Sequence, residues 1–446
     1  MKRGPTRRRA KKAVRATVLL GGFFAVAAAS VDGHAYISEN GSTTTVICGV
    51  PITVPNGSSN GEGVWNGEGY GEGNNSTTVV SNECNPAAIL AFFNANFQTL
   101  TNFYGNISNY MEMFRSGFGG NLPFTAYRPG APTFQLASRS DLAGVGPRSN
   151  QPLFIAQAPS SVGDGTRFAV WAYGTGVFGH VAADGAAPGY RHNTGGFIAG
   201  FDWQSQNWMV GAHAGYAGTN IRVRDDGSHV SINHAIVGVH GALRWDSGRL
   251  NTFYVDGIFN VGFLDHNVTQ SLTTLGFPGT LATGGPGGTS VGGKVELGSI
   301  FRYWDFEFNP YAALQVVHLN TDSYTLTSSA TTVSVGSVAT TSVRLHLAGQ
   351  LGKRWSFADG SALKLNFRLG WVAELADTRQ NTSVSALGGA VTFNAASNSV
   401  GRHFALVGAN AHYQMGRGFG FLVDYRVETN SRSTTHALLG GIRYTW

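Results

Sequence analysis

Apolar and polar residues alternate along roughly the last 280 residues of the chain, with the two-residue period of a β-strand. Counting back from the C-terminus by twos places Trp446, Tyr444 and Ile442 on one face and Thr445 and Arg443 on the other. The same alternation occurs in residues 197–203, 343–351, 363–371 and 419–428. In a soluble β-sandwich the apolar face would form the core. In an outer-membrane barrel it would meet lipid, and the polar face would line the lumen.

The connections between these stretches favour the barrel. Short polar turns lie at residues 204–207, 246–249, 358–361 and 415–418, and longer links lie at 183–193, 224–229, 265–289, 322–339 and 376–402. Short turns on one side, long loops on the other and an even strand number are typical of bacterial outer-membrane barrels. The sequence therefore predicts an all-β transmembrane barrel of about twelve antiparallel strands over residues 167–446. Tryptophans at strand ends are expected in the interfacial belts: Trp171, Trp203, Trp208, Trp245, Trp304, Trp355 and Trp371.

The N-terminus has the layout of a secretory signal peptide, predicted over residues 1–35. Eight lysines and arginines within residues 1–15 precede an apolar run at 16–29 and a small-residue cleavage motif at 33–35. The chain has a net charge of +6, of which residues 1–35 contribute +7, so the remaining chain carries −1. The basic isoelectric point therefore belongs to the removed segment and gives no argument for a nucleic-acid partner.

Several stretches, taken in order, resemble the translocator barrel of type V autotransporters. They are residues 188–203 (PGYRHNTGGFIAGFDW), 207–216 (NWMVGAHAGY), 309–314 (NPYAAL) and 440–446 (GGIRYTW). The resemblance implies a self-contained secretion system whose barrel anchors and translocates an N-terminal passenger. It also implies periplasmic chaperones and a barrel-assembly machinery that recognises the C-terminal aromatic strand, here Tyr444 and Trp446. The expected location is the bacterial outer membrane, in contact with lipid, with the passenger at the cell surface.

The expected passenger, residues 36–120, is short and shows no repeat. Cys48 and Cys84 are the only cysteines of the chain, and an exported protein meets an oxidising compartment, so we expect a disulfide between them. Three Gly-Glu-Gly triplets begin at Gly61, Gly67 and Gly71. Their carboxylates could bind a cation, but the spacing matches no metal-binding loop, which favours a flexible polar loop.

A helix is predicted at residues 86–116, inside the passenger. Its apolar residues are spaced alternately three and four apart, as in a heptad repeat: Leu90, Phe93, Phe97, Leu100, Tyr104, Ile107, Met111 and Phe114. Asn85 and Pro86 suit a helix start, and the glycines after Phe114 suit its end. The apolar stripe could pack within the passenger, associate with a second copy, or contact another partner. Gly105 and many asparagines weaken the helix.

The proline-rich residues 121–166 are expected to form a linker, part of which lies in the barrel lumen. Charged residues on the polar faces of the strands are expected to face this lumen and to contact the threaded linker. They are Arg344, Lys364, Arg368, Asp424, Arg426 and Arg443.

No catalytic motif is recognisable, so the sequence predicts no enzyme, no catalytic residue, no metal site and no cofactor. Two functions remain. The first is an autotransporter that displays a small passenger, for adhesion or self-association. The second is an outer-membrane pore that is plugged by its N-terminal segment.

Overall fold

The computed structural model describes residues 36–37, 42–47, 50–55, 87–117 and 166–446, except 185–186, 225–226, 248–250, 276, 390 and 416–417. The chain divides into two compact units, residues 1–84 and 85–446. The predicted signal peptide, both cysteines, the Gly-Glu-Gly triplets and linker residues 121–165 lie outside the described residues. In the first unit, β1 (Tyr36–Ile37), β2 (Ser42–Ile47) and β3 (Val50–Pro55) form an antiparallel sheet in the order β1-β2-β3.

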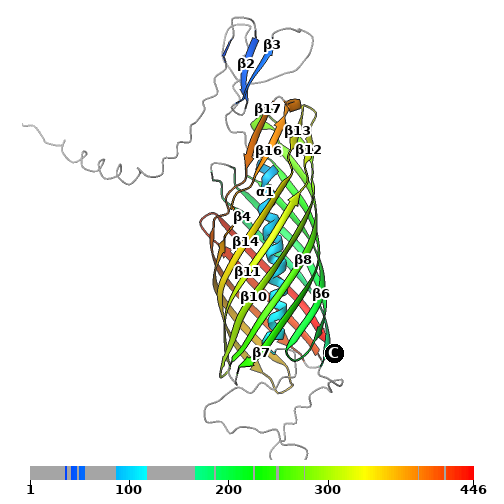
Figure 1. Cartoon of the computed structure of the whole chain (residues 1–446), viewed down its shortest axis with the longest axis vertical. Helices are drawn as coiled ribbons and strands as arrows, with labels where there is room; N and C mark the ends of the chain where they lie inside the picture. Colours follow the sequence, from blue (N-terminus) through cyan, green and yellow to red (C-terminus); the bar gives the residue numbers. More distant parts are fainter. Residues whose placement is uncertain are drawn as a thin grey trace, which may run out of the picture. The chain divides into compact units, whose positions relative to one another are not determined.

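The second unit is a closed antiparallel barrel of 12 long strands, which confirms the predicted fold (Figure 1). The strands are β4 (Arg167–Val181), β5 (Tyr190–Gln204), β6 (Trp208–Val223), β7 (His229–Ser247), β8 (Asn251–Ser271), β10 (Gly287–Tyr303), β11 (Phe306–Thr321), β14 (Val338–Ser356), β15 (Ala362–Glu374), β18 (His403–Gln414), β19 (Phe419–Thr429) and β20 (Ser433–Thr445). The last strand pairs with the first, from Ser433 opposite Val181 to Thr445 opposite Ala169. Closure leaves no sheet edge unpaired, as a lipid environment requires.

The two ends of the barrel differ. One end carries short turns, including Trp304–Asp305 between β10 and β11, which the sequence analysis did not identify. In the turn before β15, the hydroxyl and backbone N–H of Ser361 donate to Asp359 Oδ1 at 2.6 and 2.9 Å, which lowers the pKa of that carboxyl. The other end carries longer connections built on β9 (Leu281–Gly284), β12 (Tyr324–Thr327), β13 (Thr332–Val335), β16 (Asn381–Ala386), β17 (Val391–Ala396) and the 3₁₀ turns η2 (Thr273–Leu275) and η3 (Leu387–Gly389). We call these the short-turn end and the long-loop end.

Side chains alternate between the outer and the inner face of the wall. On β19, Phe421, Val423 and Tyr425 are exposed, whereas Asp424 and Arg426 between them are buried inside. At the short-turn end, Trp446 stacks on Tyr444 with ring centroids 5.7 Å apart, as part of an outer aromatic girdle. Trp171 was expected in this belt, and that prediction is wrong: its odd-numbered register on β4 turns it inward, where it is 3% exposed.

A single helix, α1 (Ala87–Arg115), fills the lumen (Figure 1). Its 29 residues span about 43 Å, more than the ~30 Å of a bilayer's hydrocarbon core. The predicted helix is therefore present, but the structure places it inside the barrel instead of in a separate passenger. The apolar stripe and the asparagines between it are both covered, because the wall surrounds the helix on every side. Within the described residues, no helix is both long and apolar enough to cross a membrane.

Candidate functional site: the interface between the helix and the lumen wall

The contacts of α1 define the direction in which the chain passes through the barrel. Near its start, Asn94 Nδ2 donates to the carbonyl oxygen of Asn398 in the long-loop end, at 3.2 Å. At its other terminus, Arg244 Nη1 on β7 donates to the carbonyl oxygens of Phe114 and Arg115, both at 3.2 Å. These carbonyls have no partner inside the helix, and a cation beside them also suits the negative end of the helix dipole. The chain therefore enters the lumen at the long-loop end and leaves it at the short-turn end.

A first charged cluster anchors the last turn of the helix. Arg115, 1% exposed, pairs with Asp256 on β8 and with Glu296 on β10, where Nη1 lies 2.6 Å from Oε1. Its guanidinium carbon lies 4.2 Å from the ring centre of Tyr254. Lys294 Nζ bridges Glu296 at 3.0 Å and the hydroxyl of Ser108 on the helix at 2.9 Å. A buried arginine thus holds two carboxylates that would otherwise repel each other.

A second cluster surrounds Glu112, which is 1% exposed. Asn366 Nδ2 donates to Glu112 Oε1 at 2.7 Å, and Lys364 Nζ lies 3.3 Å from the same oxygen. Arg368 Nη2 lies 3.9 Å from Glu112 Oε2 and donates to Asn109 Oδ1 on the helix at 2.6 Å. One wall strand, β15, therefore presents two cations, Lys364 and Arg368, to a single helix carboxylate.

Arg426 accounts for the glycine in the middle of the helix. Its Nη2 donates to the carbonyl oxygen and to Oδ1 of Asn102, at 3.0 and 2.6 Å. A Cβ atom on Gly105 would lie 1.6 Å from Arg426 Nη1, so the guanidinium occupies the space that any other side chain would need. Gly105 is therefore a contact position for the wall, in addition to being a weak helix former.

A hydrogen-bonded network joins the helix to the β4–β8 side of the wall. The Tyr110 hydroxyl donates to Asp202, accepts from Gln204 Nε2 at 3.1 Å, and its ring stacks on Trp171 at 4.6 Å. Asp202 also contacts His240, whose Nδ1 lies 3.0 Å from Nδ1 of His213. These contacts tie one tyrosine of the helix to four strands of the wall, β4, β5, β6 and β7.

All six charged residues expected to face the lumen are buried in the barrel interior. Arg344, Lys364, Arg368 and Arg426 contact α1 directly, with Arg344 Nη1 3.4 Å from Thr101 Oγ1. Asp424 lies 3.9 Å from Arg368, and Arg443 reaches Tyr110 through Gln204. Within the described residues, the contacts of these six side chains lead directly or through one neighbour to α1, whereas linker residues 121–165, their expected partner, lie outside the described residues. The partners of these side chains on α1 were not predicted from the sequence: Asn102, Asn109, Tyr110, Glu112 and Arg115. Their available signal was that polar residues lie between the apolar positions of the heptad stripe.

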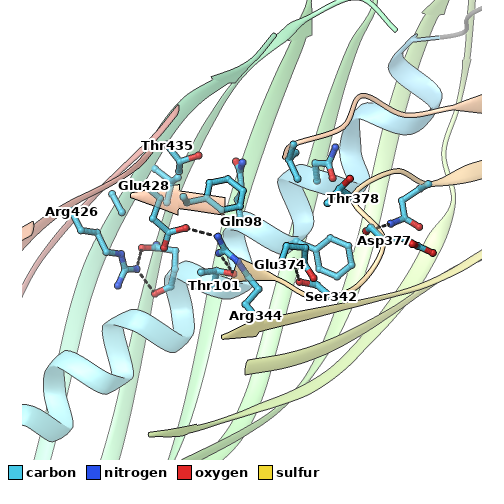
Figure 2. Close-up of a pocket in the computed structure, with 18 residues that line it drawn as sticks. Gln98, Thr101, Ser342, Arg344, Glu374, Asp377, Thr378, Arg426, Glu428 and Thr435 are labelled. Carbon is cyan, nitrogen blue, oxygen red and sulfur yellow. Dashed lines mark hydrogen bonds and ion pairs between the residues drawn. The ribbon is translucent and has the colours of Figure 1, made fainter. Parts of the chain in front are cut away.

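Two cavities lie between the helix and the wall. The one nearer the long-loop end, drawn in Figure 2, has a volume of about 60 Å³, room for roughly four waters. There Arg344 Nη2 pairs with Glu428 at 2.7 Å, and the Ser342 hydroxyl donates to Glu374 at 2.6 Å. The second cavity, of about 30 Å³, shares Thr101, Arg426 and Glu428 with the first. Among the residues described, no three His, Cys, Asp or Glu side chains are grouped to hold a metal ion.

Comparison with known proteins matches the barrel. A family model described as the autotransporter β-domain matches residues 170–426. The probable autotransporter YpjA of Escherichia coli (strain K12) is 26% identical over 207 residues, which cover 45% of this chain and only 12% of YpjA. Among solved structures, the β domain of the Bordetella autotransporter BrkA covers 62% of this chain and 99% of its own, at 19% identity and a TM-score of 0.47. The translocator domain of NalP from Neisseria meningitidis covers 64% and 90%, at 16% identity and a TM-score of 0.46.

Proposed function

Because the chain belongs to the autotransporter β-domain family, we propose that its outer-membrane barrel translocates and anchors its own N-terminal segment at the cell surface. The observation that supports this proposal is the direction of α1. The helix begins at the long-loop end, beside Asn398, so the chain before Ala87 starts from that end. Long loops face the exterior in bacterial outer-membrane barrels, and short turns face the periplasm.

The displayed segment in this proposal is shorter than residues 36–120. Residues 87–115 stay inside the wall as the segment that follows the passenger through the lumen. The apolar stripe of α1 is covered by the barrel, which speaks against self-association through this helix. Adhesion or self-association is therefore proposed for residues 36–86, and no catalytic step is proposed for the barrel.

An epitope tag after Gly57 tests the proposal on intact cells. The matched controls are tags at Ser329, between β12 and β13 at the long-loop end, and at Gly360, in the short turn between β14 and β15. We expect the Gly57 tag to bind antibody without outer-membrane permeabilisation, as the Ser329 tag does. A Gly57 tag that is labelled only after permeabilisation, like the Gly360 tag, would contradict display.

The plugged pore is the alternative, and it is favoured by the buried ion pairs that hold α1 in the lumen. The two functions differ in the location of residues 36–86, so the same tag separates them. If display is found, deletion of residues 36–84 tests its purpose. We expect the deletion to abolish surface adhesion or cell–cell aggregation while the barrel still inserts.

We also propose that the barrel-assembly machinery recognises the last strand through its aromatic residues, with periplasmic chaperones as earlier partners. Tyr444 and Trp446 end β20 on the lipid-facing side, and both are exposed. Replacement Trp446→Ala should lower the amount of folded barrel in the membrane. Phe419→Ala, which removes the exposed ring that packs on Tyr444 at 4.6 Å, is the matched control and should have a weaker effect. Equal yields of both variants and of the parent protein would argue against recognition at Trp446.

A further inference from the structure

A groove of about 540 Å³ lies on the lipid-facing surface near the short-turn end. Its sides are large apolar residues that are well exposed, among them Trp245 on β7, Leu297 on β10 and Leu347 on β14. Its floor is made of small residues, Ser299 on β10 and Ala312 on β11. Because no charged residue lines the groove, it suits a hydrocarbon ligand.

The groove exists because small residues interrupt a wall of large ones. Pro310, near the start of β11, has no N–H to donate, and the pairing of β10 with β11 skips Ser299 and Ile300, between Gly298–Tyr311 and Phe301–Phe308. Proline inside a strand usually marks an edge, a bulge or another irregular position. Here its compact ring leaves space on the outer face of the sheet. The rings of Phe301 and Phe308 stack 6.4 Å apart, on the next directly paired positions toward the short turns.

The groove runs across five strands, from the membrane interface toward the bilayer centre. Trp245 lies opposite Phe253 on β8, which lies opposite Ser299; farther along, Ala312 lies opposite Leu347. Trp245 is close to the end of β7 at Ser247, whereas Leu347 is far from the end of β14 at Ser356. Four strand spacings of ~4.8 Å give a length of about 19 Å. With strands tilted by ~40°, this length covers roughly 12–15 Å of depth, close to one leaflet.

We propose that this groove binds one acyl chain of a phospholipid from the periplasmic leaflet. The occupant follows from the position: the barrel stands in the outer membrane, and the groove opens at the short-turn end. Trp245 lies where the chain would enter, at the depth at which indole rings prefer the headgroup region. The chain lies along the floor formed by Ser299, Pro310 and Ala312, so it is held on the protein while neighbouring lipids exchange.

Native mass spectrometry of the full-length protein, extracted in mild detergent and offered phosphatidylethanolamine, tests the proposal. We expect one retained phospholipid per barrel. Ala312→Phe fills the groove with a side chain compatible with lipid and should lower retention roughly tenfold. Ala172→Phe is the matched control, because Ala172 lies on the exposed face of β4, away from the groove, and it should leave retention unchanged.

A second variant and a second readout guard against misfolding. Ser299→Val raises the floor by less than Ala312→Phe does, and heat-dependent mobility on gels reports whether each variant is a folded barrel. A phospholipid spin-labelled in its acyl chain should show an immobilised fraction in the parent protein that is reduced in both groove variants. Equal retention in Ala312→Phe and Ala172→Phe would overturn the proposal. A lipid-free dimer that only the groove variants dissociate would also overturn it, in favour of a second copy as the occupant.

Discussion

The helix meets two different walls inside one barrel. Toward β6, β7 and β8 the contact is close and depends on shape, since a Cβ on Gly215 would lie only 3.1 Å from the Phe103 ring. Toward β14, β15 and β19 the wall is farther away, and long charged side chains such as Arg344, Arg368 and Arg426 cross the distance, with cavities between them. The comparison indicates that the first wall positions the helix by close packing together with the Tyr110 network, and that the second holds it through long polar side chains.

Replacing the central cation of the charged clusters should have the largest effect. Arg115→Met removes the ion-pair partner of Asp256 and leaves Glu296 with Lys294 and the Tyr254 hydroxyl, in a buried setting. Breaking a buried ion pair from one side costs about 3–5 kcal/mol. Guanidinium unfolding of the purified barrel in detergent should show this loss. A loss below that of the packing variant described next would mean that Arg115 is hydrated and contributes little.

Overpacking the close wall should cost less. Gly215→Val adds methyl groups where Phe103, Ile236 and the carbonyl oxygen of Phe197 already lie within 3.2 Å of a Cβ. Such crowding costs about 1–3 kcal/mol, although valine is otherwise favourable in a strand. Gly440→Val is the control, because a Cβ there meets nothing within 4 Å. Similar unfolding free energies for both variants would show that the helix can move away from β6.

The pair between the two cavities should affect permeation more than stability. The side chains of Arg344 and Glu428 are 9% and 15% exposed, and their Nη2–Oε2 distance is 2.7 Å. Arg344→Gln should lower the unfolding free energy by about 1.5 kcal/mol, the low end for a hydrogen bond to a charged group, because both side chains keep some contact with water. Because glutamine is shorter than arginine, the change enlarges the cavity beside Glu428 and should raise single-channel conductance in planar bilayers. An unchanged conductance would mean that the cavities do not connect into a path for ions.

The smallest predicted effect is informative through its sign. Gly105→Ala would stabilise an ordinary helix by about 0.5–1 kcal/mol. Here the added methyl group displaces the Arg426 guanidinium from Asn102, and a hydrogen bond to a charged group contributes about 1.5–3 kcal/mol. The net result should be a loss of about 1 kcal/mol. In the Arg426→Gln background the same substitution should instead stabilise the barrel. Stabilisation in both backgrounds would contradict the claim that Gly105 is needed to make room for the Arg426 guanidinium.

The barrel could be predicted from sequence because its information is local. Two-residue alternation and loop lengths are visible within each hairpin. The heptad spacing of α1 is visible within the helix segment itself, from Leu90 to Phe114. The location of α1 was not predictable in this way. Glu112 and Lys364 are 252 residues apart, and the local sequence around either residue does not indicate that the other is its partner. Gly105 and the asparagines of α1 indicated a weak helix, whereas the structure shows that they are contacts for a polar wall. The groove at Pro310 likewise could not be predicted, because it depends on the small residue Ser299 on the neighbouring strand β10.

Disulfide formation across the close wall tests the one-sided packing of the helix most directly. In a background without Cys48 and Cys84, Thr99→Cys with Thr219→Cys replaces two hydroxyls that lie 3.3 Å apart. Thr99→Cys with Thr340→Cys is the matched pair, since Thr340 is buried on β14, on the opposite wall. We predict that the first pair oxidises in the folded barrel on cells and that the second pair stays reduced. Equal oxidation of both pairs, or of neither, would contradict a helix held in the lumen against β6.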